Sequence, residues 1–85
     1  MPALFHLTAS SGDKKIFEGD LQSMTAPGEI GYLGILANHA PLMTTLVPGR
    51  ITVRDASGAV KSFESISRGF LEVLDNKVTI LLDRE

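Results

Sequence analysis

Cysteine is absent from this 85-residue chain. Its absence excludes disulfide bonds, thiol catalysis and every zinc site built on cysteine. Long apolar runs are absent too, since none approaches the roughly 18–20 residues that span a bilayer. The first residues, from Met1 to Leu7, lack the basic start and apolar stretch of a signal peptide. We therefore expect neither a disulfide-rich secreted protein nor one that spans a membrane.

Positive charge is also scarce. Eight Lys and Arg residues stand against ten Asp and Glu, for a net charge of −2, and Lys14-Lys15 is the one adjacent basic pair. Nucleic-acid binding requires clustered cations that neutralise phosphates, so we expect no nucleic-acid partner. Hydrophobic residues make up 44% of the chain, which argues against disorder.

Helical periodicity is missing as well. Eight Gly and four Pro residues interrupt the chain, and no segment sustains helical spacing of apolar residues through two turns. Alternating and β-branched residues favour short strands instead. A chain of this length forms one domain, here 1–85, with a small core. Many short strands in one small domain predict an all-β fold, either a β-sandwich or a small barrel.

The clearest predicted element is a C-terminal hairpin. Gly69–Leu74 and Lys77–Leu82 flank Asp75-Asn76, and both turn residues tolerate the positive φ of a type I′ turn. This turn sets Val73 opposite Val78. One face of the hairpin is then apolar: Leu71, Val73, Val78, Ile80 and Leu82. Phe70 and Leu81 fall opposite each other on the other face, so we expect another segment or a partner to cover them.

Further strands are expected before this hairpin. In the segment from Lys15 to Thr25, Met24 falls out of phase with Leu21, which indicates a bulge or bend. A second hairpin is expected from Arg50 to Ser65, but its register stays open. The other expected strands are Leu4 to Ala9, Gly31 to Leu36 and Leu42 to Val47.

Catalytic and metal-binding patterns are weak. His6 is interpreted as a residue on the polar face of a strand, while His39 is either a turn residue bonded to a backbone carbonyl or a contact to a partner. Two isolated histidines do not supply a metal site. No serine lies in a Gly-x-Ser-x-Gly elbow, so a hydrolase using Ser11 and His39 is the least favoured hypothesis.

The glycine-rich stretch from Gly28 to Gly34 contains no Lys-Ser/Thr pair, so a phosphate-binding loop is not indicated. Its glycines predict tight bends that leave Glu29, Ile30 and Tyr32 on an exposed tip. Exposed apolar residues on such a tip suggest contact with a protein. The residues by themselves therefore favour a small β interaction module without catalytic activity.

Two blocks of sequence resemble the epsilon subunit of F-type ATP synthase. The first runs from Gly31 to Gly49 and contains Asn38-His39-Ala40-Pro41-Leu42; the second is Ser67-Arg68-Gly69-Phe70-Leu71-Glu72-Val73. The resemblance covers nearly all of the chain. It implies a β-sandwich of two antiparallel sheets, with about five strands each. It also implies a non-catalytic central-stalk subunit that joins the gamma subunit to the c-ring and couples proton-driven rotation to ATP synthesis.

The resemblance also implies two sets of contact residues. For the gamma subunit they are Ser11, His39 and Thr44. For the c-ring they are Glu29, Ile30, Gly31, Tyr32 and Leu33. No cofactor and no metal is implied, and the expected location is the cytoplasmic face of the bacterial plasma membrane, peripherally bound through the complex.

The chain departs from the family pattern at several positions. Tyr32 stands where an acidic residue is common, Ala37 replaces a proline, and Arg68 replaces a glycine. The family's C-terminal helical hairpin is expected to be absent because the chain ends at Glu85, so no ATP binding is expected. The alternative hypothesis is a free-standing β-sandwich that binds a peptide or small molecule between its sheets.

Overall fold

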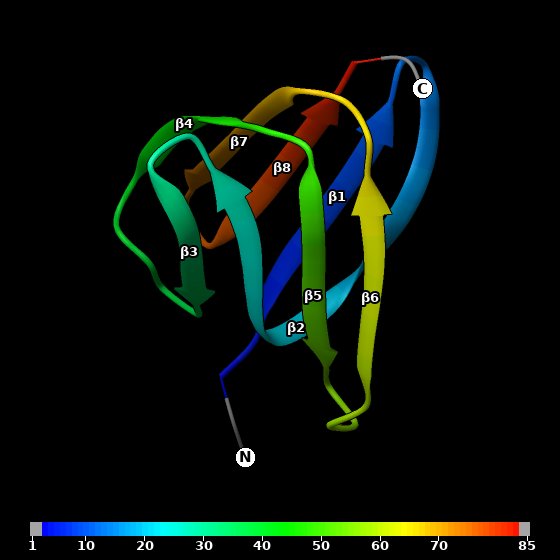
Figure 1. Cartoon of the computed structure of the whole chain (residues 1–85). Coiled ribbons are helices and arrows are strands. Elements are labelled where there is room, and N and C mark those ends of the chain that lie inside the picture. Colours follow the sequence, from blue (N-terminus) through cyan, green and yellow to red (C-terminus); the bar gives the residue numbers. More distant parts are fainter. Residues whose placement is uncertain (1–2, 84–85) are drawn as a thin grey trace.

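The computed structural model describes residues 3–83, so the outermost residues of the expected domain, 1–2 and 84–85, lie outside the described part. Eight strands and no helix occupy it, and none of it forms a helix that could cross a membrane (Figure 1). The strands are β1 (Phe5–Ser11), β2 (Lys14–Gly28), β3 (Gly31–Leu36), β4 (Leu42–Leu46), β5 (Gly49–Asp55), β6 (Val60–Ser65), β7 (Gly69–Leu74) and β8 (Lys77–Leu82).

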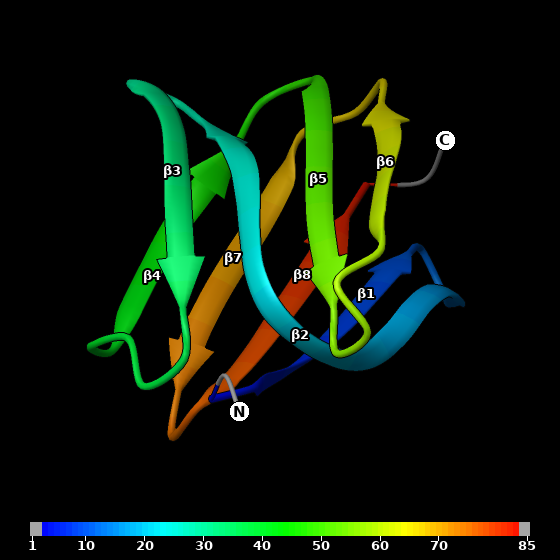
Figure 2. The same ribbon diagram turned by 90° about the horizontal axis from the view of Figure 1, so that it is seen from below.

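The strands form two packed layers, which confirms the predicted all-β sandwich (Figure 2). The first layer runs from the N-terminal half of β2 through β1, β8 and β7 to β4. The second contains β3, the C-terminal half of β2, β5 and β6. One pairing departs from the antiparallel prediction, because β1 and β8 run parallel.

Strand β2 belongs to both layers because it bends along its length. Its pairing with β5 shifts register between Leu21 and Ser23, so Gln22 is an extra residue. Leu21 and Met24 are three positions apart, yet both are buried. Strict alternation would turn one of them outward, and the inserted residue restores the inward phase. The predicted bulge or bend in this segment is confirmed.

The C-terminal hairpin has the predicted register. Val73 lies opposite Val78 and Phe70 lies opposite Leu81. Asp75 and Asn76 both have positive φ, at 51° and 62°, as a type I′ turn requires. The five residues of the predicted apolar face are all buried. Together with inward residues of the other strands they form one core between the layers.

The second hairpin pairs β5 with β6 without a register shift, from Gly49 opposite Ser65 to Arg54 opposite Val60. Asp55 closes its turn, since one carboxylate oxygen accepts hydrogen bonds from the backbone N–H of Ser57 and from its hydroxyl. These bonds lower the pKa of Asp55, and the bond from the Ser57 hydroxyl has the largest effect. The pairing of this hairpin, whose register the sequence left open, is regular from end to end.

Candidate functional site

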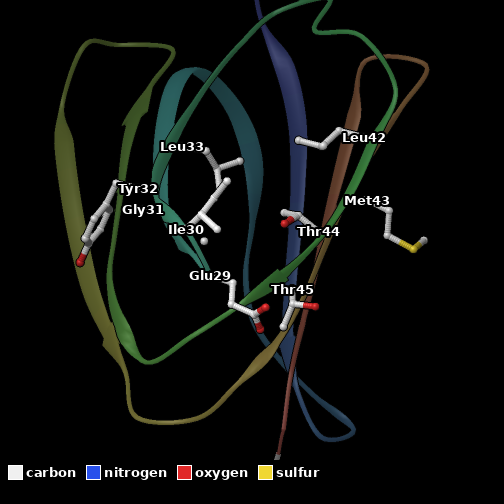
Figure 3. A pocket seen from close by; sticks show the side chains of 10 residues that line it. Glu29, Ile30, Gly31, Tyr32, Leu33, Leu42, Met43, Thr44 and Thr45 are labelled. Atoms are coloured by element: carbon white, nitrogen blue, oxygen red, sulfur yellow. The ribbon is translucent and has the colours of Figure 1, made fainter.

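A surface groove of about 640 Å³ opens between the turn that joins β2 to β3 and the neighbouring strand β4. Residues 28–33 line one side and residues 42–45 line the other. Figure 3 shows the two groups facing each other across the groove. All five residues predicted to contact the c-ring lie here, and so does Thr44 from the set predicted to contact gamma.

The β2–β3 turn is tight because only Glu29 and Ile30 separate the paired residues Gly28 and Gly31. Gly31 has a φ of +133°, a conformation that only glycine adopts without strain. The chain therefore reverses within two residues. Ile30 projects from the turn and is fully exposed, at 103% of its reference area. The predicted exposed tip is confirmed.

Glu29 is held by an ion pair. Its Oε1 atom lies 2.7 Å from Nη2 of Arg68, in the loop between β6 and β7. Both side chains are more than half exposed, so water screens the pair and its contribution to stability is at most about 1 kcal/mol. The pair nonetheless links the tip to a loop that lies far away in sequence. The negative charge of Glu29 has a cation directly beside it.

Tyr32 is bound on the opposite side of the turn. Its hydroxyl oxygen accepts a hydrogen bond of 3.0 Å from the backbone N–H of Arg50, in β5. The ring points away from β4 in Figure 3 and is 61% exposed. Leu33, the next residue, is half-buried and packs against the core. The turn is thus anchored to the second layer both at its surface and underneath.

Strand β4 forms the other side of the groove. Thr44 is half-buried and lies opposite Leu71 of β7, whereas Met43 is exposed and points away from the groove (Figure 3). One edge of β4 pairs with β7. Its other edge pairs with β2 at a single position, where Leu46 lies opposite Gly28. The two layers are therefore joined at Leu46 and separate from there along the groove.

Ser11 and His39 lie outside this groove. Ser11 ends β1 next to Leu82, and its hydroxyl donates a 3.2 Å hydrogen bond to the carbonyl oxygen of Asp83. His39 precedes β4, whose first residue, Leu42, lies at the opposite end of the same layer. The hydrolase hypothesis is wrong because serine and histidine of a catalytic pair must be within hydrogen-bond reach.

His39 shows the first of its two expected interactions. Its side chain is exposed, and Nδ1 lies 2.8 Å from the carbonyl oxygen of the neighbouring residue Ala40. The ring therefore helps to fix the loop between β3 and β4. A contact of the second ring nitrogen with a partner stays a prediction.

A second polar cluster lies on the outer surface of β1 and β2. His6 Nδ1 lies 2.9 Å from Asp20 Oδ1, and Nε2 lies 2.8 Å from Glu18 Oε2. Both hydrogen bonds raise the pKa of His6, and the bond to Asp20 has the larger effect. Lys15 pairs with Glu18 and, together with His6, lowers the pKa of that carboxyl group. The strand position predicted for His6 is confirmed.

Metal binding is not indicated by the geometry. No group of three His, Asp or Glu side chains within residues 3–83 is arranged to hold a metal ion.

Two contacts of the tip were not predicted from the sequence, that of Glu29 with Arg68 and that of Tyr32 with Arg50. The replacement of a family glycine by Arg68 was the one available signal for the first contact.

Comparison with known proteins identifies relatives along nearly the whole chain. Residues 4–84 match the family described as "ATP synthase, Delta/Epsilon chain, beta-sandwich domain". The ATP synthase epsilon chain of Xanthomonas euvesicatoria pv. vesicatoria is 48% identical over 73 residues, which are 86% of this chain and 51% of the relative. That of Xanthomonas campestris pv. campestris strain B100 is 47% identical over the same shares. The chain thus spans about half the length of these curated relatives.

Two solved structures share the fold. In the mitochondrial ATP synthase OSCP/F1/c-ring structure of Euglena gracilis, one chain matches with a TM-score of 0.87 and 27% identity, covering 96% of this chain and 52% of that one. In the central stalk/c-ring structure of the Tetrahymena thermophila mitochondrial enzyme, the TM-score is 0.75 at 20% identity, with 96% and 65% covered. The second likeness shows the fold alone.

Proposed function

The chain belongs to the family of ATP synthase delta and epsilon chains, through their β-sandwich domain, and from that premise we propose that it is a non-catalytic subunit of the central stalk. In this role it joins the gamma subunit to the c-ring and couples proton-driven rotation to ATP synthesis. The observation that carries the proposal is the β2–β3 tip, where all five residues expected to meet the c-ring come together beside one groove.

The c-ring surface is this tip. Ile30 stands clear of the rest of the chain, Tyr32 is more than half exposed, and Leu33 connects the turn to the core. A turn that is fixed at its base and exposed at its end suits a contact that must carry force. Packed interiors resist shear. A force applied at the tip is therefore transmitted to the other layer without displacing the two layers relative to each other.

The gamma surface is proposed to use Thr44, His39 and Ser11. Thr44 borders the same groove, while His39 and Ser11 lie at opposite ends of the β4–β7–β8–β1 layer. A partner that reaches both ends would cover the outer face between them. Phe70 and Leu81, which are 55% and 53% exposed, lie on that face. No other part of residues 3–83 buries this pair. We therefore propose that the partner covers it, since the sequence predicted that another segment or a partner would.

The proposed location is peripheral, at the cytoplasmic face of the bacterial plasma membrane, with attachment through the complex. The bacterial source of the relatives supports this proposal. No ligand chemistry is assigned to the chain itself, because its proposed role is to connect two other subunits.

Depletion tests the proposal. Inverted membrane vesicles from bacteria that lack the chain should lose proton-driven ATP synthesis, and the gamma subunit should wash off the membrane. Adding the intact gene product back should restore both. Vesicles that synthesise ATP at an undiminished rate without the chain would contradict the proposal.

The groove supports one alternative, a free-standing module that binds a peptide or small molecule. Its volume of about 640 Å³ lies within the range of ordinary ligand pockets. An NMR titration with a single saturable site in the groove, and no affinity for gamma, would favour that alternative.

A further inference from the structure

We infer that Asn76 positions His39 for its contact with the gamma subunit, by tying the loop between β3 and β4 to the turn between β7 and β8. The inference rests on the proposed function, which makes His39 part of the gamma surface. It adds to that surface a residue that acts through the loop and lies 38 positions after the loop residue that it binds.

Asn76 makes two side-chain hydrogen bonds to segments far away in the sequence. Its Oδ1 atom accepts a 2.7 Å bond from the backbone N–H of Asn38, the residue before His39. Its Nδ2 atom donates a 2.8 Å bond to the carbonyl oxygen of Leu4, just before β1. One half-buried side chain therefore joins three segments, which meet at one end of the molecule in Figure 2.

The loop that carries His39 crosses from the second layer to the first, since β3 belongs to one and β4 to the other. Residues 38–41 are exposed, and the bond of His39 to Ala40 stays within the loop. Asn38 has a φ of +61°, so the chain turns sharply just before His39. The bond to Asn76 holds this turn against the first layer, whose outer face carries the rest of the proposed gamma surface.

The β7–β8 turn by itself does not require an amide at position 76. Both of its central residues have positive φ, and glycine meets that demand at least as well as asparagine. Asparagine tolerates the same conformation and also carries an acceptor and a donor on one short side chain. Because the two observed bonds use both groups, they account for the amide where the turn alone does not.

The expected effect follows from how often His39 is in place. A loop that has lost its bond to Asn76 samples other positions, and the apparent affinity falls with the fraction of the chain that is ready to bind. The net effect of one neutral hydrogen bond is about 1 kcal/mol, which changes such an equilibrium by about fivefold. Loss of the bond should therefore weaken gamma binding about fivefold.

Asn76→Gly tests the inference, because it keeps the turn and removes both side-chain bonds. The full gene product is titrated into the soluble part of the ATP synthase, which contains gamma and has been depleted of this chain. Asn76→Gly should bind about fivefold more weakly than the wild type. Asp75→Gly is the matched control, since it makes the same change at the other central position of the turn, and it should bind within about twofold of the wild type.

Hydrogen exchange of single amides, measured by NMR on the free gene product, follows the loop itself. The amide of Asn38 should exchange about fivefold faster in Asn76→Gly and at the wild-type rate in Asp75→Gly. The amides of Glu72 and Thr79, which lie opposite each other in the hairpin, should keep their wild-type rates in both variants. This pattern would show that the hairpin is intact and that the loop alone has been released.

A double-variant cycle distinguishes positioning from a general structural role. If Asn76 acts through His39, Asn76→Gly should weaken binding by less than about twofold in a chain that already carries His39→Ala. If the two residues act independently, the loss should be about fivefold in both backgrounds.

The outcomes separate the inference from the proposed function. Wild-type affinity of Asn76→Gly or of His39→Ala, weaker binding while Asn38 stays protected, or equal losses in the two backgrounds would each overturn the positioning role, with gamma still the partner. A folded wild-type chain without affinity for gamma would overturn the inference and the proposed function together.

Discussion

Replacing Val73 by alanine tests which face of the C-terminal hairpin forms the core. Val73 is 2% exposed and lies in the middle of the first layer, opposite Val78 of β8 and Leu42 of β4. The substitution removes two methyl groups from a site that is enclosed on both sides. It changes neither the turn nor any polar group, so the effect on stability comes from packing alone.

The expected loss follows from the removed volume. Two buried methyl groups account for about 1.6 kcal/mol of transfer free energy. A residual cavity of roughly 40 Å³ adds about 1 kcal/mol. The free energy of unfolding should therefore fall by about 2–3 kcal/mol, a large part of the roughly 4–13 kcal/mol expected for a domain of this size. The melting temperature should drop by roughly 10–20 °C.

Urea unfolding followed by far-ultraviolet circular dichroism measures this loss, since the chain has no tryptophan for fluorescence. Leu74→Ala is the matched control, because Leu74 is the next residue, faces outward and is 49% exposed. It should change the free energy of unfolding by less than about 0.5 kcal/mol. A small effect at Val73 with a large one at Leu74 would mean that the two faces are reversed.

Three further predictions concern other parts of the chain. Tyr32→Asp should weaken c-ring attachment while lowering stability by less than about 1 kcal/mol, because the exposed ring gives up one hydrogen bond that water can replace; a large fall in melting temperature would refute this. Gly69→Ala should destabilise the chain by more than about 2 kcal/mol in urea unfolding, because its new methyl group would overlap the carbonyl oxygen of Leu81, and near-normal stability would refute the close approach. His6→Gln should reduce stability more at about pH 5.5 than at about pH 8.5: the raised pKa of His6 means that its contribution is complete below about pH 6.5 and lost as the pH rises through the folded value. Equal losses at the two pH values would show that the carboxylates do not favour the charged imidazole.

The C-terminal hairpin was predictable because its turn and its alternation agree. Asp75-Asn76 admits a single short turn, and that turn fixes which residues face each other. The hairpin from β5 to β6 was not predictable to the same degree. Val60 is exposed and Phe63 is half-buried, so its second strand offers little contrast between faces to set a register.

The exposed tip was predictable from the spacing of its glycines, but its contacts were not. Glu29 and Arg68 are 39 residues apart, and a pair of surface charges leaves no periodic trace in a sequence. The parallel pairing of β1 with β8 was missed for a similar reason. Strands far apart in the chain meet through the closure of the whole sandwich, which local patterns do not describe.

In the proposed function, one small sandwich holds two different subunits at once. Photo-crosslinking in the assembled enzyme tests it most directly, with one probe at position 30 on the tip and another at position 44 on β4. We expect a product with the c-ring subunit from position 30 and a product with gamma from position 44, within the same preparation. Products with one and the same subunit from both positions, or with neither, would contradict it.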